Sequence, residues 1–166
     1  MIGLISLLVL APMPQSTAQT QKLKMLDLKF LEGNWEGKGW QSRGDDKDVF
    51  WGEEKARFSA GGTALVIEGK QQGTVNGSAG TRERYNGLVV ITWNSVEEKY
   101  RISQQMSDGN YAEYKGELKD KILSWNLGSN LSLTLQVKDG EWLEEAWRSE
   151  GEQKLKIFEL RMKKEA

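Results

Sequence analysis

The feature that most limits how this chain folds is the alternation of apolar and polar residues that runs through much of it after residue 32. Residues 131–138, for example, have the sequence Leu-Ser-Leu-Thr-Leu-Gln-Val-Lys. Successive side chains of a β-strand point to opposite faces, so this pattern predicts a strand with one apolar and one wet face. Pairs such as Asp108-Gly109 and Asp139-Gly140 follow such segments and predict tight antiparallel hairpins.

Turn-forming residues divide the chain into about ten predicted strands joined by short connections. These are expected at residues 33–41, 49–60, 63–71, 87–93, 100–106, 111–118, 122–127, 131–137, 141–148 and 154–163. The apolar run 87–93 is too short for a helix, and it predicts a strand that is buried on both faces or crosses the base of a barrel.

Helical spacing of apolar residues is confined to residues 22–32, and Gly33 marks a stop. A meander of many strands would leave two unpaired edges in an open sheet, and both twist and unpaired edges favour closure. We therefore predict an all-β fold, a ten-stranded antiparallel up-and-down barrel over residues 33–166, after an N-terminal segment and short helix at 19–32. Such a barrel leaves room for a small ligand inside.

Residues 1–18 have the pattern of a signal peptide. Their apolar core at 2–11 is too short to span a bilayer, and the small residues Ser16 and Ala18 fit cleavage after Ala18. This pattern predicts a secreted or periplasmic protein with no membrane insertion after cleavage. The alternative is a buried N-terminal helix, against which Pro12 and Pro14 count because proline breaks helices.

Histidine and cysteine are both absent from the chain. Their absence excludes Ser-His and Cys-His nucleophiles, zinc sites made of His or Cys, disulfides and His-ligated haem. The 23 Lys and Arg residues nearly balance the 24 Asp and Glu residues, which argues against a nucleic-acid partner. We expect no metal and no cofactor, and the sequence carries no signal for an oligomeric state.

Several motifs occur in a fixed order along the chain. They are Phe-Leu-Glu-Gly-Asn-Trp-Glu-Gly-Lys-Gly at 30–39, Tyr-Asn-Gly-Leu-Val-Val-Ile-Thr-Trp-Asn at 85–94, Lys-Tyr-Arg at 99–101, Ser-Asp-Gly at 107–109, Tyr-Lys-Gly-Glu-Leu at 114–118 and Trp-Leu-Glu-Glu at 142–145. As a set, they resemble a family of secreted bacterial lipocalin-like proteins classed as a domain of unknown function. The resemblance implies a calycin-type barrel with an interior cavity and no settled activity.

The chain departs from this family at residues 150–155, where a Gly-rich turn and a Trp are usual, and this departure concerns the shape of the last hairpin. Nitrobindin barrels are similar in architecture but hold haem through a histidine. Because this chain has no histidine, that function does not carry over.

Trp35 and Arg161 are predicted to close the base of the barrel. Trp35 begins the first strand and Arg161 lies on the last, and these two strands are neighbours in a closed barrel. By resemblance to lipocalins, Arg161 would stack on Trp35 in a cation–π contact worth about 0.5–2 kcal/mol. The alternative is an exposed Arg161 on the wet outer face.

Seven tryptophans are many for this length, and core packing accounts for most of them. The remainder are expected to line a ligand cavity together with polar groups. If the leucines of 131–137 face inward, Trp125 shares their face. Trp147 and Glu145 are assigned to the cavity as well, with Trp142 pointing outward or covering an end. The full predicted lining is Trp51, Arg57, Tyr100, Gln104, Tyr114, Trp125, Leu133, Glu145 and Trp147.

Charged residues also fall on predicted strands. On residues 53–57, the inward face carries either Glu54 with Ala56, or Glu53 with Lys55 and Arg57. A buried charge must be paired or must contact water or ligand, so a partly polar cavity is expected. An inward arginine would suit a carboxylate head group.

The favoured function is an exported barrel that binds a small apolar or carboxylate-bearing molecule in an aromatic-lined cavity, with no need for catalysis. One alternative is an enzyme that uses Glu145 or Glu54 with a tyrosine or arginine, marked by a carboxyl of strongly raised pKa at the cavity floor. Another is a plugged barrel that acts through its outer surface as a protein-interaction module.

Overall fold

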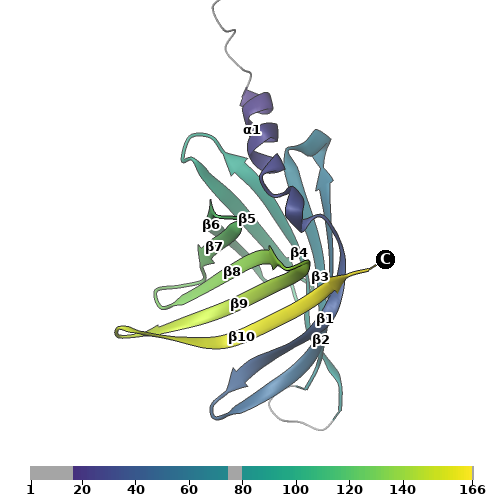
Figure 1. Ribbon diagram of the computed structural model, residues 1–166, viewed down its shortest axis with the longest axis vertical. Helices are drawn as coiled ribbons and strands as arrows, with labels where there is room; N and C mark the ends of the chain where they lie inside the picture. Colours follow the sequence, from purple (N-terminus) through teal and green to yellow (C-terminus); the bar gives the residue numbers. More distant parts are fainter. Residues whose placement is uncertain (1–16, 75–79, 166) are drawn as a thin grey trace, which may run out of the picture.

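Strands follow one another around a closed antiparallel barrel in the computed structural model, which describes residues 17–74 and 80–165 (Figure 1). The strands are β1 Gly33–Arg43, β2 Asp46–Ser59, β3 Ala64–Gly73, β4 Arg82–Asn94, β5 Lys99–Met106, β6 Tyr111–Lys119, β7 Ile122–Asn126, β8 Leu131–Lys138, β9 Glu141–Glu150 and β10 Gln153–Lys164. Each pairs with the next along the chain, and β10 pairs with β1, so no sheet edge is left open. The predicted ten-stranded up-and-down barrel is confirmed.

The strand at 87–93 differs from its prediction. It is part of the longer β4, and it is not buried on both faces, because Ile91 is fully buried while Leu88 is 37% exposed. The barrel wall here is a single layer of strands, so residues that alternate with the inward ones face water. A continuous apolar sequence therefore does not require two covered faces.

The hairpin between β8 and β9 has the tight turn that Asp139-Gly140 predicts. Both residues have positive φ, 53° and 80°, as a two-residue hairpin turn requires. The turn sets the register, in which Leu135 lies opposite Glu144. Paired residues share a face of the sheet, so this register decides which residues of β9 face into the barrel.

A short helical segment covers one end of the barrel, at the top of Figure 1. It consists of α1 Thr17–Leu26 and the 3-10 helix η1 Lys29–Leu31, so the helix begins earlier than predicted and is interrupted before residue 29. Met25, Leu28 and Leu31 are fully buried against the barrel. None of the described helices is long and apolar enough to cross a membrane. Most of the predicted signal peptide, residues 1–16, lies outside the described residues.

Hydrogen bonds fasten this helical segment to the barrel. The Trp35 indole Nε1 donates to the Leu31 carbonyl at 2.9 Å, and the Tyr100 hydroxyl donates to the Lys24 carbonyl at 2.9 Å. Burial raises the pKa of Tyr100 to about 12, so its hydroxyl keeps the proton that it donates. This end of the barrel is closed by both apolar packing and directed bonds.

The predicted stacking of Arg161 on Trp35 is wrong. Trp35 is buried and packs on Trp142, with ring centroids 5.6 Å apart, and the Lys164 ammonium lies 5.5 Å from the Trp35 ring centroid. Arg161 instead points outward and pairs with Glu159 at 2.8 Å. Leu160 and Met162 fill the interior, and strand alternation therefore places Arg161 on the wet face, which was the alternative reading.

Candidate functional site

The barrel contains an interior pocket of about 330 Å³. Its apolar wall comes from β3, β4, β5 and β7 to β10 and from the connection after β7: Ile67, Val89, Ile91, Ile102, Trp125, Leu127, Leu131, Leu133, Leu135, Trp142, Ala146, Ile157 and Phe158. Its polar members are Gln41, Glu54, Gln71, Arg84, Tyr85, Gln104 and Glu144. The pocket is therefore mostly apolar with a few convergent polar groups, as small-molecule sites are.

Three of the nine residues predicted to line a cavity do so: Gln104, Trp125 and Leu133. Two others are inward but lie elsewhere. Tyr100 is buried beneath the helical segment, and Tyr114 packs against the core without lining the pocket. The parity that joined Trp125 to the inward leucines of β8 was correct.

The remaining four predicted residues lie on the outer face, which corrects their assignment. On β2, Trp51 is 39% exposed and Arg57 pairs with Glu68 at 2.8 Å, while Glu54 and Ala56 face inward. Of the two inward faces considered for residues 53–57, the structure therefore has the one that carries Glu54 and Ala56. Sequence alternation alone could not choose between them, because both faces carry charge.

On β9, Glu145 and Trp147 point outward, where Lys156 pairs with Glu145 and lies 5.1 Å from the Trp147 ring centroid. Trp142 and Glu144 take the inward positions instead. The turn at residues 139–140 contained the signal for this, because a two-residue turn pairs Leu135 with Glu144 and so places both on the inner face.

Two β-bulges add side chains to the pocket that simple alternation would place outside. In the β3–β4 ladder, Gln71 pairs with Tyr85 but Gln72 pairs with Glu83, so Arg84 is an extra residue. Arg84 and its neighbour Tyr85 consequently both line the pocket. A second bulge in the β9–β10 ladder, between Lys156 and Phe158, does the same for Ile157 and Phe158.

Arg84 is held in place from several sides. One terminal nitrogen donates to the Thr74 carbonyl and lies 3.6 Å from Asp48, and the other donates to Gln41 at 2.5 Å. The guanidinium carbon lies 5.1 Å from the Phe50 ring centroid. The Nε atom is buried and has no hydrogen-bond partner among the described residues. Arg84 thus lines the pocket and keeps one buried donor that has no partner in the described part of the chain.

Glu54 is 5% exposed, and desolvation raises its pKa well above the ordinary value. The charge of Glu144 raises the pKa of Glu54 further. Glu144 has part of its surface accessible, and because it lies inside the barrel that surface faces the pocket. Burial raises the pKa of Glu144 to about 7. The pocket therefore holds two carboxyl groups whose pKa values are raised above the ordinary value.

Neutral hydrogen-bonding groups surround this acid pair. Gln104 donates to the Tyr85 hydroxyl at 3.4 Å, and burial together with the Glu54 charge raises the pKa of Tyr85. Trp142 is 1% exposed, and its Nε1 has no hydrogen-bond partner among the described residues. Sequence reasoning missed Glu144 as an inward acid because it had assigned the opposite face of β9 to the cavity.

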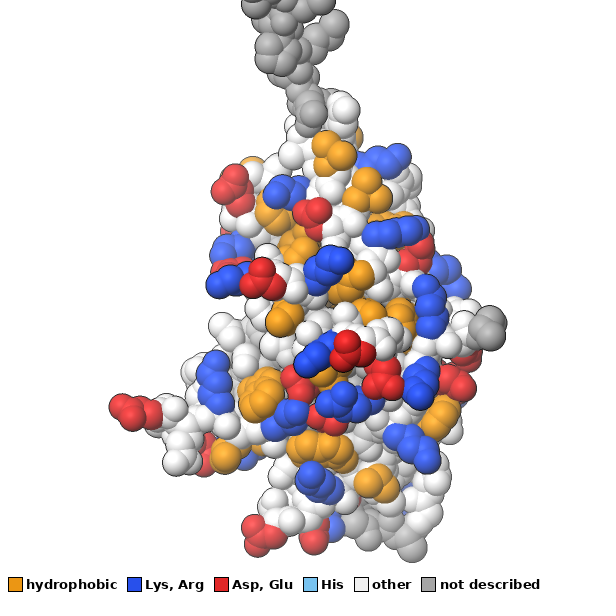
Figure 2. Space-filling model, viewed as in Figure 1, with side chains coloured by type: hydrophobic (Ala, Val, Ile, Leu, Met, Phe, Trp, Pro, Cys, Tyr) orange, Lys and Arg blue, Asp and Glu red, His pale blue; other side chains and the backbone are white. Residues whose placement is uncertain are grey.

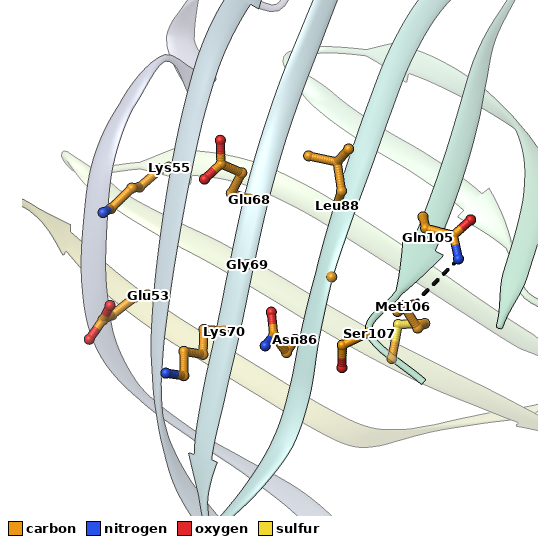
Figure 3. Close-up of a pocket in the computed structure, with 11 residues that line it drawn as sticks. Glu53, Lys55, Glu68, Gly69, Lys70, Asn86, Leu88, Gln105, Met106 and Ser107 are labelled. Carbon is orange, nitrogen blue, oxygen red and sulfur yellow. Dashed lines mark hydrogen bonds between the residues drawn. The ribbon is translucent and has the colours of Figure 1, made fainter. Parts of the chain in front are cut away.

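A separate depression of about 440 Å³ lies on the outside of the barrel, over β2 to β5 (Figure 3). Glu53, Lys55, Glu68 and Lys70 stand around the side-chain-free backbone of Gly69, and all four are exposed. Charges of both signs are also interspersed over the face shown in Figure 2. A solvent-exposed, charged depression would leave an apolar molecule in contact with water, so the interior pocket is the candidate site.

A scan against protein-family models and a search of curated proteins each gave no match. Among solved structures, the chain is similar to the zebrafish ileal bile acid-binding protein, determined in complex with cholic acid. That match covers 81% of this chain and 98% of the other at 10% identity, with a TM-score of 0.45. No residue role is transferred from it, and the resemblance to the bacterial lipocalin-like family stays a prediction.

Proposed function

We propose that this protein binds a small, largely apolar molecule with a carboxylate head group in the interior pocket. The supporting observation is the pocket itself, a mostly apolar space of about 330 Å³ lined in part by Arg84, whose buried Nε–H has no partner among the described residues. Small-molecule sites span roughly 300–1,000 Å³, so this volume suits a compact ligand such as a medium-chain acid.

Arg84 supports the carboxylate part of the proposal. A guanidinium donates in a fixed plane, and the Nε–H of Arg84 is the donor that lacks an acceptor among residues 17–74 and 80–165. Leaving a buried donor without an acceptor costs free energy, and a ligand carboxylate would remove that cost. The contacts to Gln41, Thr74 and Phe50 hold the group in position before any ligand arrives.

Calorimetric titration with decanoic acid tests the proposal. We expect saturable binding that is abolished in Leu133→Trp, because the larger side chain fills the pocket from an inward position without removing a polar group. Arg84→Lys keeps the positive charge beside Asp48 but loses the Nε donor, and it should weaken binding about tenfold. Arg57→Lys, on the outer face, is the matched control and should bind as wild type. Absence of binding by wild type to decanoic acid and to longer and shorter homologues would overturn the proposal.

Export is part of the proposal, supported by the apolar core at 2–11 and the small residues before position 19. Expression of the full chain in a bacterial host, followed by fractionation and mass measurement, tests it. The expected product is a periplasmic or secreted chain that begins at Gln19. A cytoplasmic product that retains residue 1 would contradict export.

A second candidate function, acid–base catalysis in the same pocket, is favoured by the carboxyls of raised pKa at Glu54 and Glu144. Incubation of the protein with a panel of apolar esters and epoxides, followed by mass spectrometry, tests it. Turnover that is lost in Glu54→Gln would support an enzyme. No conversion of any compound would leave binding as the function.

A further inference from the structure

The pocket has a second polar end that the carboxylate site does not use. Glu54 on β2 and Glu144 on β9 lie on strands that are separated around the barrel by β1 and β10. Both line the same pocket, and the charge of Glu144 acts on the Glu54 carboxyl. Among residues 17–74 and 80–165, no lysine or arginine forms an ion pair with either carboxyl.

The indole N–H of Trp142 is a further polar group at this place in the pocket. Its ring is 1% exposed and lines the pocket, and its N–H acts on Glu144 enough to lower the pKa of that carboxyl. It nevertheless does not reach hydrogen-bond geometry with any acceptor in the described part of the chain. A buried N–H without an acceptor is costly, and an acceptor brought by a ligand would satisfy it.

We propose that Glu54, Glu144 and the Trp142 N–H together bind a hydroxyl group carried by the ligand at the end opposite its carboxylate. The inference rests on the proposed function and names the ligand class more closely, as an apolar hydroxy acid. Its basis is the convergence of two acids and one unpaired donor on the same pocket wall.

The donor and acceptor inventory selects the hydroxyl. A hydroxyl both donates and accepts, so it gives a hydrogen bond to a carboxyl oxygen and takes one from the Trp142 N–H. An ammonium group only donates and would leave that N–H unpaired. A carboxylate only accepts, so it would be repelled by whichever of the two acids is ionised. A protonated carboxyl can also donate, so a hydroxyl is accommodated in more than one protonation state of the pair.

The spacing of the two polar ends suits a short chain between them. Glu54 lies opposite Gly69 on β3, and the bulge that carries Arg84 begins at Gln72 of the same strand. Three residues of strand correspond to roughly 10 Å. A carboxylate at Arg84 and a hydroxyl near Glu54 and Glu144 therefore call for a medium-length apolar spacer.

The test compares decanoic acid with its ω-hydroxy derivative by calorimetric titration of the full chain. A terminal hydroxyl normally weakens binding in an apolar pocket, because it must be desolvated. Here we expect the hydroxy acid to bind about fivefold more tightly than decanoic acid. In Trp142→Phe, which keeps an aromatic ring and removes the N–H, the hydroxyl should weaken binding instead.

Glu144→Leu should reverse the preference in the same way, and Glu145→Leu on the outer face is its matched control. Replacing an unpaired buried acid by leucine among apolar neighbours does not endanger folding.

If decanoic acid binds but the hydroxyl weakens binding equally in wild type and variants, the hydroxyl site is refuted and the proposed function stands. If decylamine binds more tightly than the hydroxy acid, the site recognises cations and the inference fails. If none of the acids binds, the proposed function fails, and titration with decanol then tests the hydroxyl site on its own. Decanol binding that is lost in Trp142→Phe supports the hydroxyl site. No binding of decanol to the wild-type protein refutes it.

Discussion

Glu54 lies opposite Gly69 in the β2–β3 ladder, and its carboxyl group occupies the space that a side chain at position 69 would fill. A Cβ atom there would lie 2.5 Å from one carboxyl oxygen and 2.6 Å from the other. The glycine thus makes room for an acid inside the barrel. This pairing explains how a buried acidic side chain fits a wall that is mostly apolar.

The first prediction concerns this pairing. Gly69→Ala should lower the free energy of unfolding by about 1–3 kcal/mol, because the new methyl group displaces the Glu54 carboxyl within a packed interior. Urea denaturation measures the change. Gly128→Ala is the control, since no atom lies within 4 Å of the added Cβ there, and it should change little. An alanine at 69 that is tolerated as well as one at 128 would contradict the described packing.

The second prediction is a loss of stability with rising pH. Burial raises the pKa of Glu144 from an ordinary value of 4.5 to about 7, so the folded state holds this proton more tightly than the unfolded chain does. Between these values unfolding releases a proton, and the free energy of unfolding therefore falls as pH rises, by on the order of 3 kcal/mol. Urea unfolding at pH 5 and pH 8 measures this slope.

Two variants isolate the group responsible for that slope. Glu144→Gln removes the titration and should flatten much of the dependence, leaving the contribution of Glu54, whose pKa is also raised. Glu145→Gln, one residue away on the outer face, should keep the wild-type slope. A wild-type protein that is equally stable at both pH values would show that the acids are not buried as described.

The third prediction concerns the helical segment that closes the barrel. Leu28 is fully buried, so Leu28→Ala should cost about 2–5 kcal/mol through lost contacts and the cavity that remains. Leu26 is 48% exposed, and Leu26→Ala should cost far less. The two midpoints of thermal unfolding give the comparison, and equal effects would mean that the segment does not dock on the barrel end.

The fourth prediction follows from the outward position of Arg161. Arg161→Ala should change the free energy of unfolding by less than about 0.5 kcal/mol, since the lost pair with Glu159 is at the surface. Leu160→Ala, next to it but fully buried, should cost about 2–5 kcal/mol. Denaturant unfolding of both variants checks which side chains of β10 face inward and which face outward. A large loss of stability in Arg161→Ala would instead support the predicted stacking of Arg161 on Trp35.

Local sequence patterns were enough to predict the barrel because strand pairing here is between neighbours in the chain. Each short connection, such as Asp139-Gly140, fixes one hairpin, and a series of hairpins has few arrangements other than a closed meander. Alternation correctly predicted which residues face inward wherever one face of a strand was clearly apolar, as on β8. The same prediction was wrong on β9, where Trp142 and Trp147 gave both faces an aromatic residue.

The sequence by itself determined the ten strands, their order and their approximate bounds, because alternation and turn residues act over a few neighbouring positions. The folded structure alone decided the composition of the pocket. Closing the sheet brings Glu54 and Glu144 together from distant parts of the chain, and a bulge turns Arg84 inward against the alternation. Such contacts depend on ring closure and on irregular ladder register, which no local pattern encodes.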